Sequence, residues 1–98
     1  MIKKVSFSYK VYNTVNELSS EDFKLVQESE KILNKAYAIY SGFNVGAAAL
    51  MENGEIMAAN NQENMALPSS LCAERVLLYY CKANFPDIVV KKMAISVK

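Results

Sequence analysis

The segment Leu71-Cys72-Ala73-Glu74-Arg75 contains the residue types of this chain that are best suited to chemistry. A cysteine in the first turn of a helix faces unpaired backbone N–H groups and the positive end of the helix dipole, and both favour the thiolate. Glu74 lies about 200° around such a helix from Cys72, so the two side chains would not share one ion. Glu74 would instead stand just beyond a metal held by Cys72. Taken alone, the same residues also fit a small buried cysteine beside two surface charges.

A second group of polar side chains, Asn61 and Glu63, precedes Cys72 by eleven and nine residues. At the end of a strand, such a pair would offer the fixed hydrogen-bond donors and acceptors that recognition of a sugar requires. The alternative is a polar loop that satisfies its own backbone. Phe43, taken alone, indicates a core aromatic residue, and Gly46 with the alanines after it indicates a closely packed strand.

Composition excludes several other classes of function. The chain has no histidine, which rules out serine–histidine or cysteine–histidine catalysis within it and any imidazole metal site. Arg75 is the only arginine, and the net charge is +1, so nothing supports a nucleic-acid patch or a polybasic membrane anchor. The longest apolar stretch, residues 45–51, is too short to span a bilayer. With two cysteines and no apparent secretory leader, we expect a cytoplasmic protein with reduced thiols.

The pattern of residues predicts one domain over 1–98 of the α/β class. Weak alternation over the first 18 residues indicates an edge strand or an extended arm. Ser19 with Asp22 fits a capping box, and apolar spacing predicts a helix from there to about Tyr40. Ser41-Gly42 breaks that helix before a strand over residues 43–52, which is apolar on consecutive positions and suits burial on both faces.

The second half of the chain predicts a hairpin, a helix and a strand. Asn53-Gly54 favours a type I′ turn, with the returning strand over residues 55–61. Pro68-Ser69-Ser70 predicts a helix start with a serine as N-cap, and residues 71–83 are apolar enough for a helix that is buried nearly all round. The last strand, residues 88–97, follows a helical crossover, which favours parallel pairing and therefore a mixed sheet with helices packed on it.

Three segments together resemble the zinc-dependent cytidine deaminase family. These are residues 36–48 (AYAIYSGFNVGAA), residues 61–64 (NQEN) and residues 71–75 (LCAER) at the start of a helix. Each segment alone is weak evidence, but all three occur in the family's order and spacing, and the resemblance runs from about Ser19 to Lys98. Smaller departures are Ile39, Leu67 and Ser70, which stand where proline, tyrosine and glycine are common.

The resemblance implies a role for six residues. Cys72 corresponds to the first Zn²⁺ ligand and Glu74 to the carboxylate that shuttles protons. Substrate contacts correspond to Phe43 near the pyrimidine, Asn61 and Glu63 at the ribose hydroxyls, and the Ala73 backbone at the reacting end of the base. In the family, zinc-activated hydroxide attacks C4 of cytosine and ammonia leaves.

The resemblance stops at the remaining metal ligands. Relatives supply two more from a PCxxC segment that opens a third helix, and this sequence has none. Cys81 is not a substitute, because nine helical residues place it roughly 13.5 Å from Cys72 along the axis and on about the opposite face. We therefore expect a core role for Cys81, a domain cut short after its third core strand, and little or no activity in this chain alone.

The resulting hypothesis is the first part of a pyrimidine-salvage enzyme that deaminates cytidine and deoxycytidine hydrolytically. A related hypothesis with the same chemistry is a deaminase of another cytosine nucleoside, such as blasticidin S. A second hypothesis, from a different functional class, is a metal-free and catalytically inactive module that binds a nucleoside or a partner subunit. A third and weaker hypothesis is a purely structural interaction domain. The resemblance also implies a homo-oligomer, dimer or tetramer, with active sites near subunit boundaries.

Overall fold

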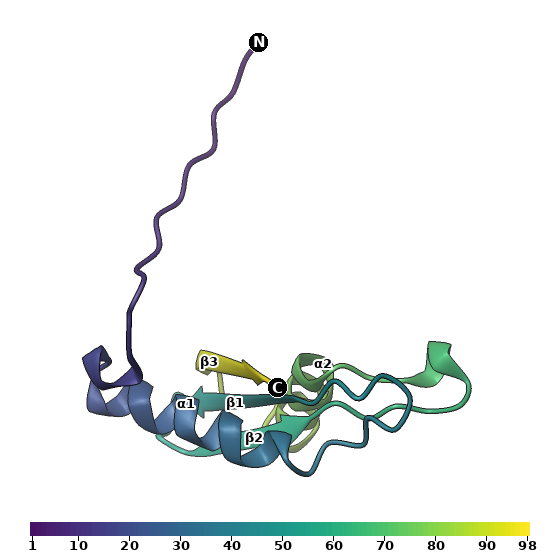
Figure 1. Ribbon diagram of the computed structural model, residues 1–98. Coiled ribbons are helices and arrows are strands. Elements are labelled where there is room, and N and C mark those ends of the chain that lie inside the picture. The colour runs from purple at the N-terminus through teal and green to yellow at the C-terminus, as the bar shows by residue number, and fades with distance from the viewer.

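The computed structural model describes the backbone of residues 1–98 and every side chain except that of Leu67. An extended arm, residues 1–12, precedes a small domain of two helices and one sheet (Figure 1). The elements are a 3-10 turn at Val15–Glu17, α1 at Ser20–Leu33, β1 at Val45–Met51, β2 at Ile56–Asn60, a second 3-10 turn at Leu67–Ser69, α2 at Ala73–Asn84 and β3 at Val90–Val97. The departure from the family at Leu67 concerns a side chain outside the described residues.

Helix α1 begins as its sequence predicts. The Ser19 side chain accepts a hydrogen bond from the backbone N–H of Asp22 at 3.2 Å, which satisfies one of the free donors of the first turn. Leu25, Ser29 and Leu33, spaced four residues apart, form the buried stripe of the helix. The Ser29 hydroxyl is 2.6 Å from the Ser96 hydroxyl, so this stripe is also tied to β3.

The helix ends at Leu33, and the prediction that it continues to about Tyr40 is wrong. Tyr37 instead lies alongside the chain that follows β2. Its N–H donates to the carbonyl of Asn61 at 3.1 Å, and its carbonyl accepts from the N–H of Glu63 at 2.8 Å. These backbone bonds replace the helical ones over this stretch, although the tyrosines keep a helical spacing in the sequence.

The three strands lie in the order β2-β1-β3, and both pairings are antiparallel. The mixed sheet and the parallel pairing of the last strand are therefore wrong. The crossover through α2 does bring β3 back in the direction of β2, but β1 lies between them, and β3 pairs with β1 in the opposite direction. A helical crossover fixes relative direction and leaves open which strand becomes the neighbour.

The hairpin between β1 and β2 is confirmed, but its turn is not type I′. A type I′ turn needs positive φ at both central residues. Gly54 has φ 92°, whereas Asn53 does not have positive φ. The Met51 N–H donates to the Glu55 carbonyl at 2.8 Å, so the loop has three residues, 52–54, instead of two, and only one of them is left-handed.

Helix α2 begins later than predicted. Its N-cap is Cys72, with no side-chain cap bond, and the serines of Pro68-Ser69-Ser70 lie in and after the preceding 3-10 turn. Mutual backbone hydrogen bonds between Gln62 and Leu71, at 2.8 and 2.9 Å, keep the chain extended up to Cys72. The prediction of burial nearly all round is also wrong, because one side of α2 exposes Leu78, Tyr79 and Tyr80.

The sheet separates two small cores, one under each helix. Ala47, Ala49 and Met51 of β1 face α2, where they pack with Ala73, Leu77 and Cys81. Ala48 and Leu50 face α1 and pack with Leu25. Consecutive buried residues along β1 therefore confirm burial on both faces, and three layers result. No helix in the described chain is long and apolar enough to cross a membrane.

Candidate functional site

The candidate site lies where the chain after β2 meets the start of α2, at the end of the domain remote from the arm. A cavity of about 210 Å³ opens there between the two segments. Its lining residues are Val45, Asn61, Glu63, Ser70, Leu71, Cys72 and Ala73. Four of the six residues singled out in the sequence, Asn61, Glu63, Cys72 and Ala73, thus border one hollow. A second cavity of about 270 Å³, lined by Tyr40, Ser41, Glu63 and Ser70, shares two of its residues with the first.

Asn61 is a buried amide that holds the loop before β1. Its Oδ1 accepts from the Val45 N–H at 2.9 Å, and its Nδ2 donates to the Phe43 carbonyl at 2.9 Å. With 8% of its surface exposed, Asn61 is one of the few buried polar residues in the domain. A carboxamide has two N–H groups and two acceptor lone pairs, so one donor and one acceptor position remain for a ligand in the cavity.

Glu63 holds the adjacent turn. Its Oε1 accepts from the N–H groups of Tyr40 and Ser41, each at 3.0 Å, and its Oε2 accepts from the Ser41 hydroxyl. The Ser41 hydroxyl in turn accepts from the Phe43 N–H at 3.0 Å. Hydrogen bonds from the Ser41 hydroxyl, then from the Ser41 and Tyr40 amides, lower the pKa of the Glu63 carboxyl below its ordinary value. The carboxylate is therefore the form that the folded loop favours.

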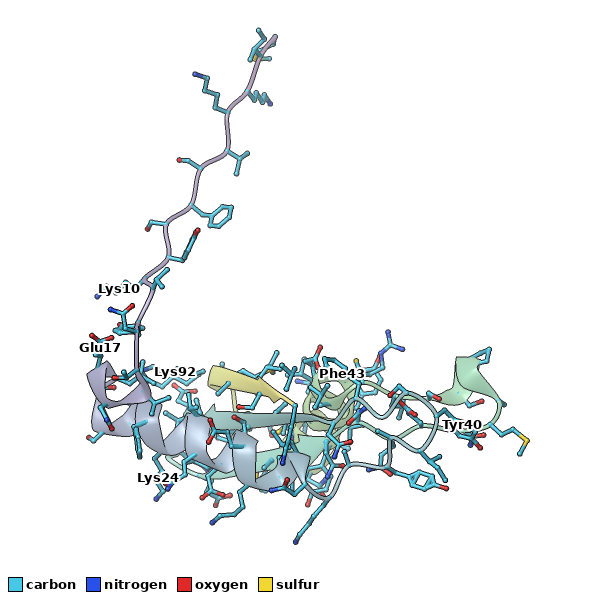
Figure 2. The ribbon with its side chains drawn as sticks, in the orientation of Figure 1. Lys10, Glu17, Lys24, Tyr40, Phe43 and Lys92 are labelled. Atoms are coloured by element: carbon cyan, nitrogen blue, oxygen red, sulfur yellow. The ribbon has the colours of Figure 1, made fainter. Side chains whose placement is uncertain are left out.

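Phe43 and Glu74 lie beside the cavity, outside its lining. Phe43 is connected to the site through its backbone, while 53% of the residue is exposed. Figure 2 shows Tyr40 toward the end of the domain away from Lys10 and the arm, and Phe43 nearer the middle of the domain. Glu74 follows Ala73 in the first turn of α2 and is half-buried. The geometry thus brings four of the six residues together and leaves these two at the margin.

Ser41 and Ser70 are site residues that the sequence did not single out. Ser41 positions Glu63, and Ser70 borders both cavities, where its hydroxyl also accepts from the Asn64 N–H at 2.8 Å. In the sequence, Ser41 indicates only a helix break and Ser70 only a helix cap. Their roles could have been predicted from the tendency of short hydroxyl side chains to form hydrogen bonds with neighbouring backbone or carboxylate groups in turns.

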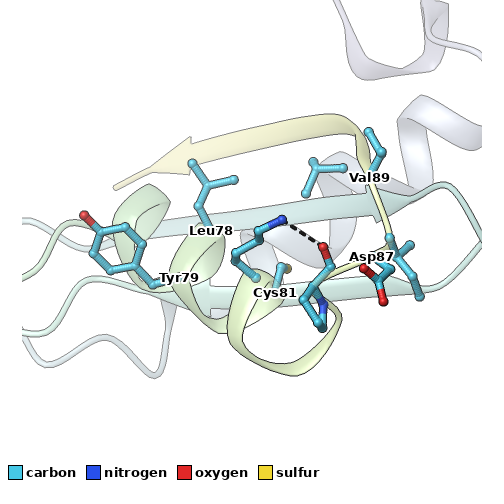
Figure 3. Close-up of a pocket in the computed structure, with 9 residues that line it drawn as sticks. Leu78, Tyr79, Cys81, Asp87 and Val89 are labelled. Carbon is cyan, nitrogen blue, oxygen red and sulfur yellow. Dashed lines mark hydrogen bonds between the residues drawn. The ribbon is translucent and has the colours of Figure 1, made fainter.

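The two thiols lie in different environments. Cys72 is exposed, and it is the N-cap residue of α2. Cys81 is buried in the core under α2, as the sequence predicts, and burial raises the pKa of its thiol. Figure 3 shows Cys81 at a separate cavity of about 490 Å³ near the end of α2, beside the hydrogen bond from Lys82 Nζ to the Pro86 carbonyl.

Comparisons with known proteins show the family of this chain. Residues 19–98 match the family model described as the cytidine and deoxycytidylate deaminase zinc-binding region. The chain belongs to this deaminase family. It is 46% identical over 56 residues to a cytidine deaminase of Sporosarcina psychrophila and 40% identical over 55 residues to one of Halalkalibacterium halodurans. These matches cover 57% and 56% of this chain but only 41% and 42% of the relatives.

Solved structures of this deaminase family show the same fold. The cytidine deaminase of Mycobacterium tuberculosis matches with a TM-score of 0.70 at 28% identity, and that of Burkholderia pseudomallei with 0.69 at 29% identity. Each match covers 76% of this chain, and 59% and 60% of the respective structures. The chain thus spans about two fifths of the curated relatives and about three fifths of these structures.

The family is a zinc-binding one, but the residues of this chain do not fit a zinc site on their own. Among the described residues, no three histidine, cysteine, aspartate or glutamate side chains lie close enough together to hold one ion. Structural and catalytic zinc sites take at least three protein ligands. Cys72 supplies one exposed thiol, and Cys81 is buried near the other end of the same helix.

Proposed function

We propose that this chain forms the nucleoside-facing part of a cytidine deaminase site. The observation that carries the proposal is the single cavity bordered by Asn61, Glu63, Cys72 and Ala73, which come from two separate segments of the chain. Ligand cavities for small organic molecules measure about 300–1,000 Å³. The 210 Å³ cavity is below this range, but with its neighbour of 270 Å³ it approaches the room that a nucleoside needs.

In this proposal, Asn61 and Glu63 bind the ribose hydroxyls with the donor and acceptor positions that their loop contacts leave free. Phe43 packs against the pyrimidine, and the Ala73 backbone contacts its amino end. Glu74, next in the chain, moves protons while the amino group at C4 is replaced by the oxygen of water and leaves as ammonia. Cys72 would be one ligand of the metal that the family binds.

We further propose that the 98-residue chain does not deaminate cytidine by itself. Cys72 provides one of the three protein ligands that a catalytic zinc ion takes. The other two would have to come from residues outside this sequence. A second candidate follows from the same deficit. It is a metal-free module that binds a nucleoside without converting it. Deamination of cytidine by the product of the complete gene favours the first candidate, and its absence with zinc present favours the second.

Titration of the isotope-labelled chain with cytidine, followed by amide NMR, tests the proposal. We expect shifts confined to residues 37–45, 61–64 and 70–74. Phe43→Ala should weaken cytidine binding roughly 2- to 10-fold, in line with loss of one aromatic contact. Tyr79→Ala, which removes another exposed aromatic side chain on α2 outside the two cavities, is the matched control and should bind like the wild type. Absence of binding, or equal weakening by both variants, would contradict the proposal.

A further inference from the structure

A single hydroxyl group connects two of the residues that the proposed function assigns to the substrate. The Ser41 hydroxyl accepts a hydrogen bond from the Phe43 N–H at 3.0 Å and donates one to Oε2 of Glu63. Phe43 lies in the loop before β1, whereas Glu63 lies in the segment after β2. Ser41 and Glu63 both line the cavity of about 270 Å³. One side chain thus ties two segments of the chain together at the wall of the site.

The backbone fixes the direction of these hydrogen bonds. An amide N–H can only donate, so the Phe43 N–H uses a lone pair of the Ser41 hydroxyl and leaves the hydroxyl proton for Glu63. The N–H groups of Tyr40 and Ser41 both donate to Oε1 of Glu63, each at 3.0 Å, so this oxygen must also accept. An ionised carboxylate is acceptor-only and is the form that satisfies all three donors at Glu63.

The Glu63 carboxylate keeps one acceptor position for a ligand. A carboxylate offers about four such positions. Two bonds from the Tyr40 and Ser41 amides occupy Oε1, and the bond from the Ser41 hydroxyl occupies one position on Oε2. Oε2 therefore carries both the hydroxyl contact and the remaining position. Without the hydroxyl, the carboxylate would be held by these donors through Oε1 alone, and Oε2 would lose the contact that fixes its direction.

We propose that Ser41 is a positioning residue, whose hydroxyl holds the Glu63 carboxylate and the Phe43 backbone in one fixed arrangement before a ligand binds. The roles of Glu63 and Phe43 toward the ligand rest on the proposed function, and Ser41 acts through these two residues. Groups that are fixed in advance lose less entropy on binding, so the hydroxyl contributes to affinity from outside the contact with the ligand.

Titration of the Glu63 carboxyl by ¹³C NMR in the 98-residue chain tests the arrangement without a ligand. In Ser41→Ala, we expect the pKa of Glu63 to rise toward its ordinary value of 4.5, because the hydrogen bond from the Ser41 hydroxyl is the largest cause of its lowering. The Phe43 amide should also lose protection against hydrogen exchange. Ser41→Thr retains a hydroxyl and should restore both properties.

The fold is not at risk in these variants, because Ser41 is exposed and lies outside both cores. Ser69→Ala is the matched control. It removes the hydroxyl of another exposed serine, outside the lining of both cavities, and should titrate like the wild type. Tyr40 and Cys72, the other titratable residues that line the two cavities, are unchanged in all of these variants.

Cytidine titration of the same variants tests the consequence for binding. Ser41→Ala should weaken cytidine binding roughly 3- to 30-fold, in line with loss of a hydrogen bond to a charged group. Its affinity should also begin to fall at a higher pH than that of the wild type, since Glu63 is protonated earlier on acidification. In a Glu63→Gln background, Ser41→Ala should have a much smaller effect, because Ser41 acts through Glu63.

Three results would overturn the proposal. They are an unchanged Glu63 pKa and Phe43 amide in Ser41→Ala, the same losses in Ser41→Thr as in Ser41→Ala, and fully additive effects of Ser41→Ala and Glu63→Gln on binding. Failure of the wild type to bind cytidine is a distinct outcome. If Ser41→Ala still raises the pKa of Glu63 and exposes the Phe43 amide, the proposed function fails and the positioning role of Ser41 is supported.

Discussion

At the scale of single residues, Asn61 and Glu63 hold the loop that forms one wall of the candidate site. Both side chains form hydrogen bonds with the backbone of residues 40–45. The alternative interpretation of the sequence, a polar loop that satisfies its own backbone, is therefore partly correct. Both residues also line the cavity. A ligand would bind to side chains that are already fixed, which reduces the entropy lost on binding.

Glu63 makes the stability of this loop depend on pH. Its pKa is lowered from the ordinary 4.5 in the folded protein, so its bonds stabilise the loop above about pH 4.5 and are lost as the pH falls through the lowered pKa. We expect the protection of the Tyr40 and Ser41 amides against hydrogen exchange, relative to the intrinsic exchange rate at each pH, to fall on acidification. Glu63→Gln should exchange fast already at neutral pH and lose this pH dependence. Unchanged protection in Glu63→Gln would show that the carboxylate does not hold the turn.

Gly46 allows α1 to approach the sheet. A Cβ atom at this position would overlap the carbonyl oxygen of Ser29 and lie 2.9 Å from the Leu33 nitrogen, both of them backbone atoms of α1. Gly46→Ala should therefore destabilise the domain by about 1–3 kcal/mol or more, measured by urea unfolding. Gly54→Ala is the control. A Cβ atom at Gly54 would meet no other atom within 4 Å, so only the left-handed φ of this residue is unfavourable for alanine, at a cost of about 1 kcal/mol. Equal effects of the two variants would refute the close approach.

At the scale of elements, local signals predicted where structure begins better than where it ends. Ser19, the Asn53-Gly54 hairpin and the doubly buried strand β1 depend on neighbouring residues, and each was predictable. The end of α1 was not, because Tyr37 exchanges helical bonds for bonds to a segment 24 residues away. The partner of β3 is likewise set by the packing of the whole sheet. Two of the three sequence motifs, residues 61–64 and 71–75, still identified four residues of one cavity.

Helix α2 provides a test of which of its faces stabilises the domain. Leu77 is fully buried against β1 and β2, while its neighbour Leu78 is 41% exposed. Leu77→Ala should lower the free energy of unfolding by about 2–5 kcal/mol, as for other buried leucines. Leu78→Ala should cost less than half as much in the same denaturant titration. A larger loss at Leu78 would mean that another surface covers this face in solution.

At the scale of the whole molecule, the chain is a three-layer domain with a small core on each side of its sheet. Much of that core is alanine, and Met51, Leu77 and Cys81 are its largest fully buried side chains. A domain of this size buries a modest share of its surface, and its stability is correspondingly limited.

The proposed function requires a site that is sufficient to bind a nucleoside and insufficient for metal-dependent turnover. The most direct test is the release of ammonia from cytidine by the 98-residue chain after dialysis against Zn²⁺, with the bound zinc measured in the same sample. We predict no turnover and no stoichiometric zinc, although cytidine binds. One zinc retained per chain, with turnover that Glu74→Gln lowers by about 10²–10⁴, would contradict the account.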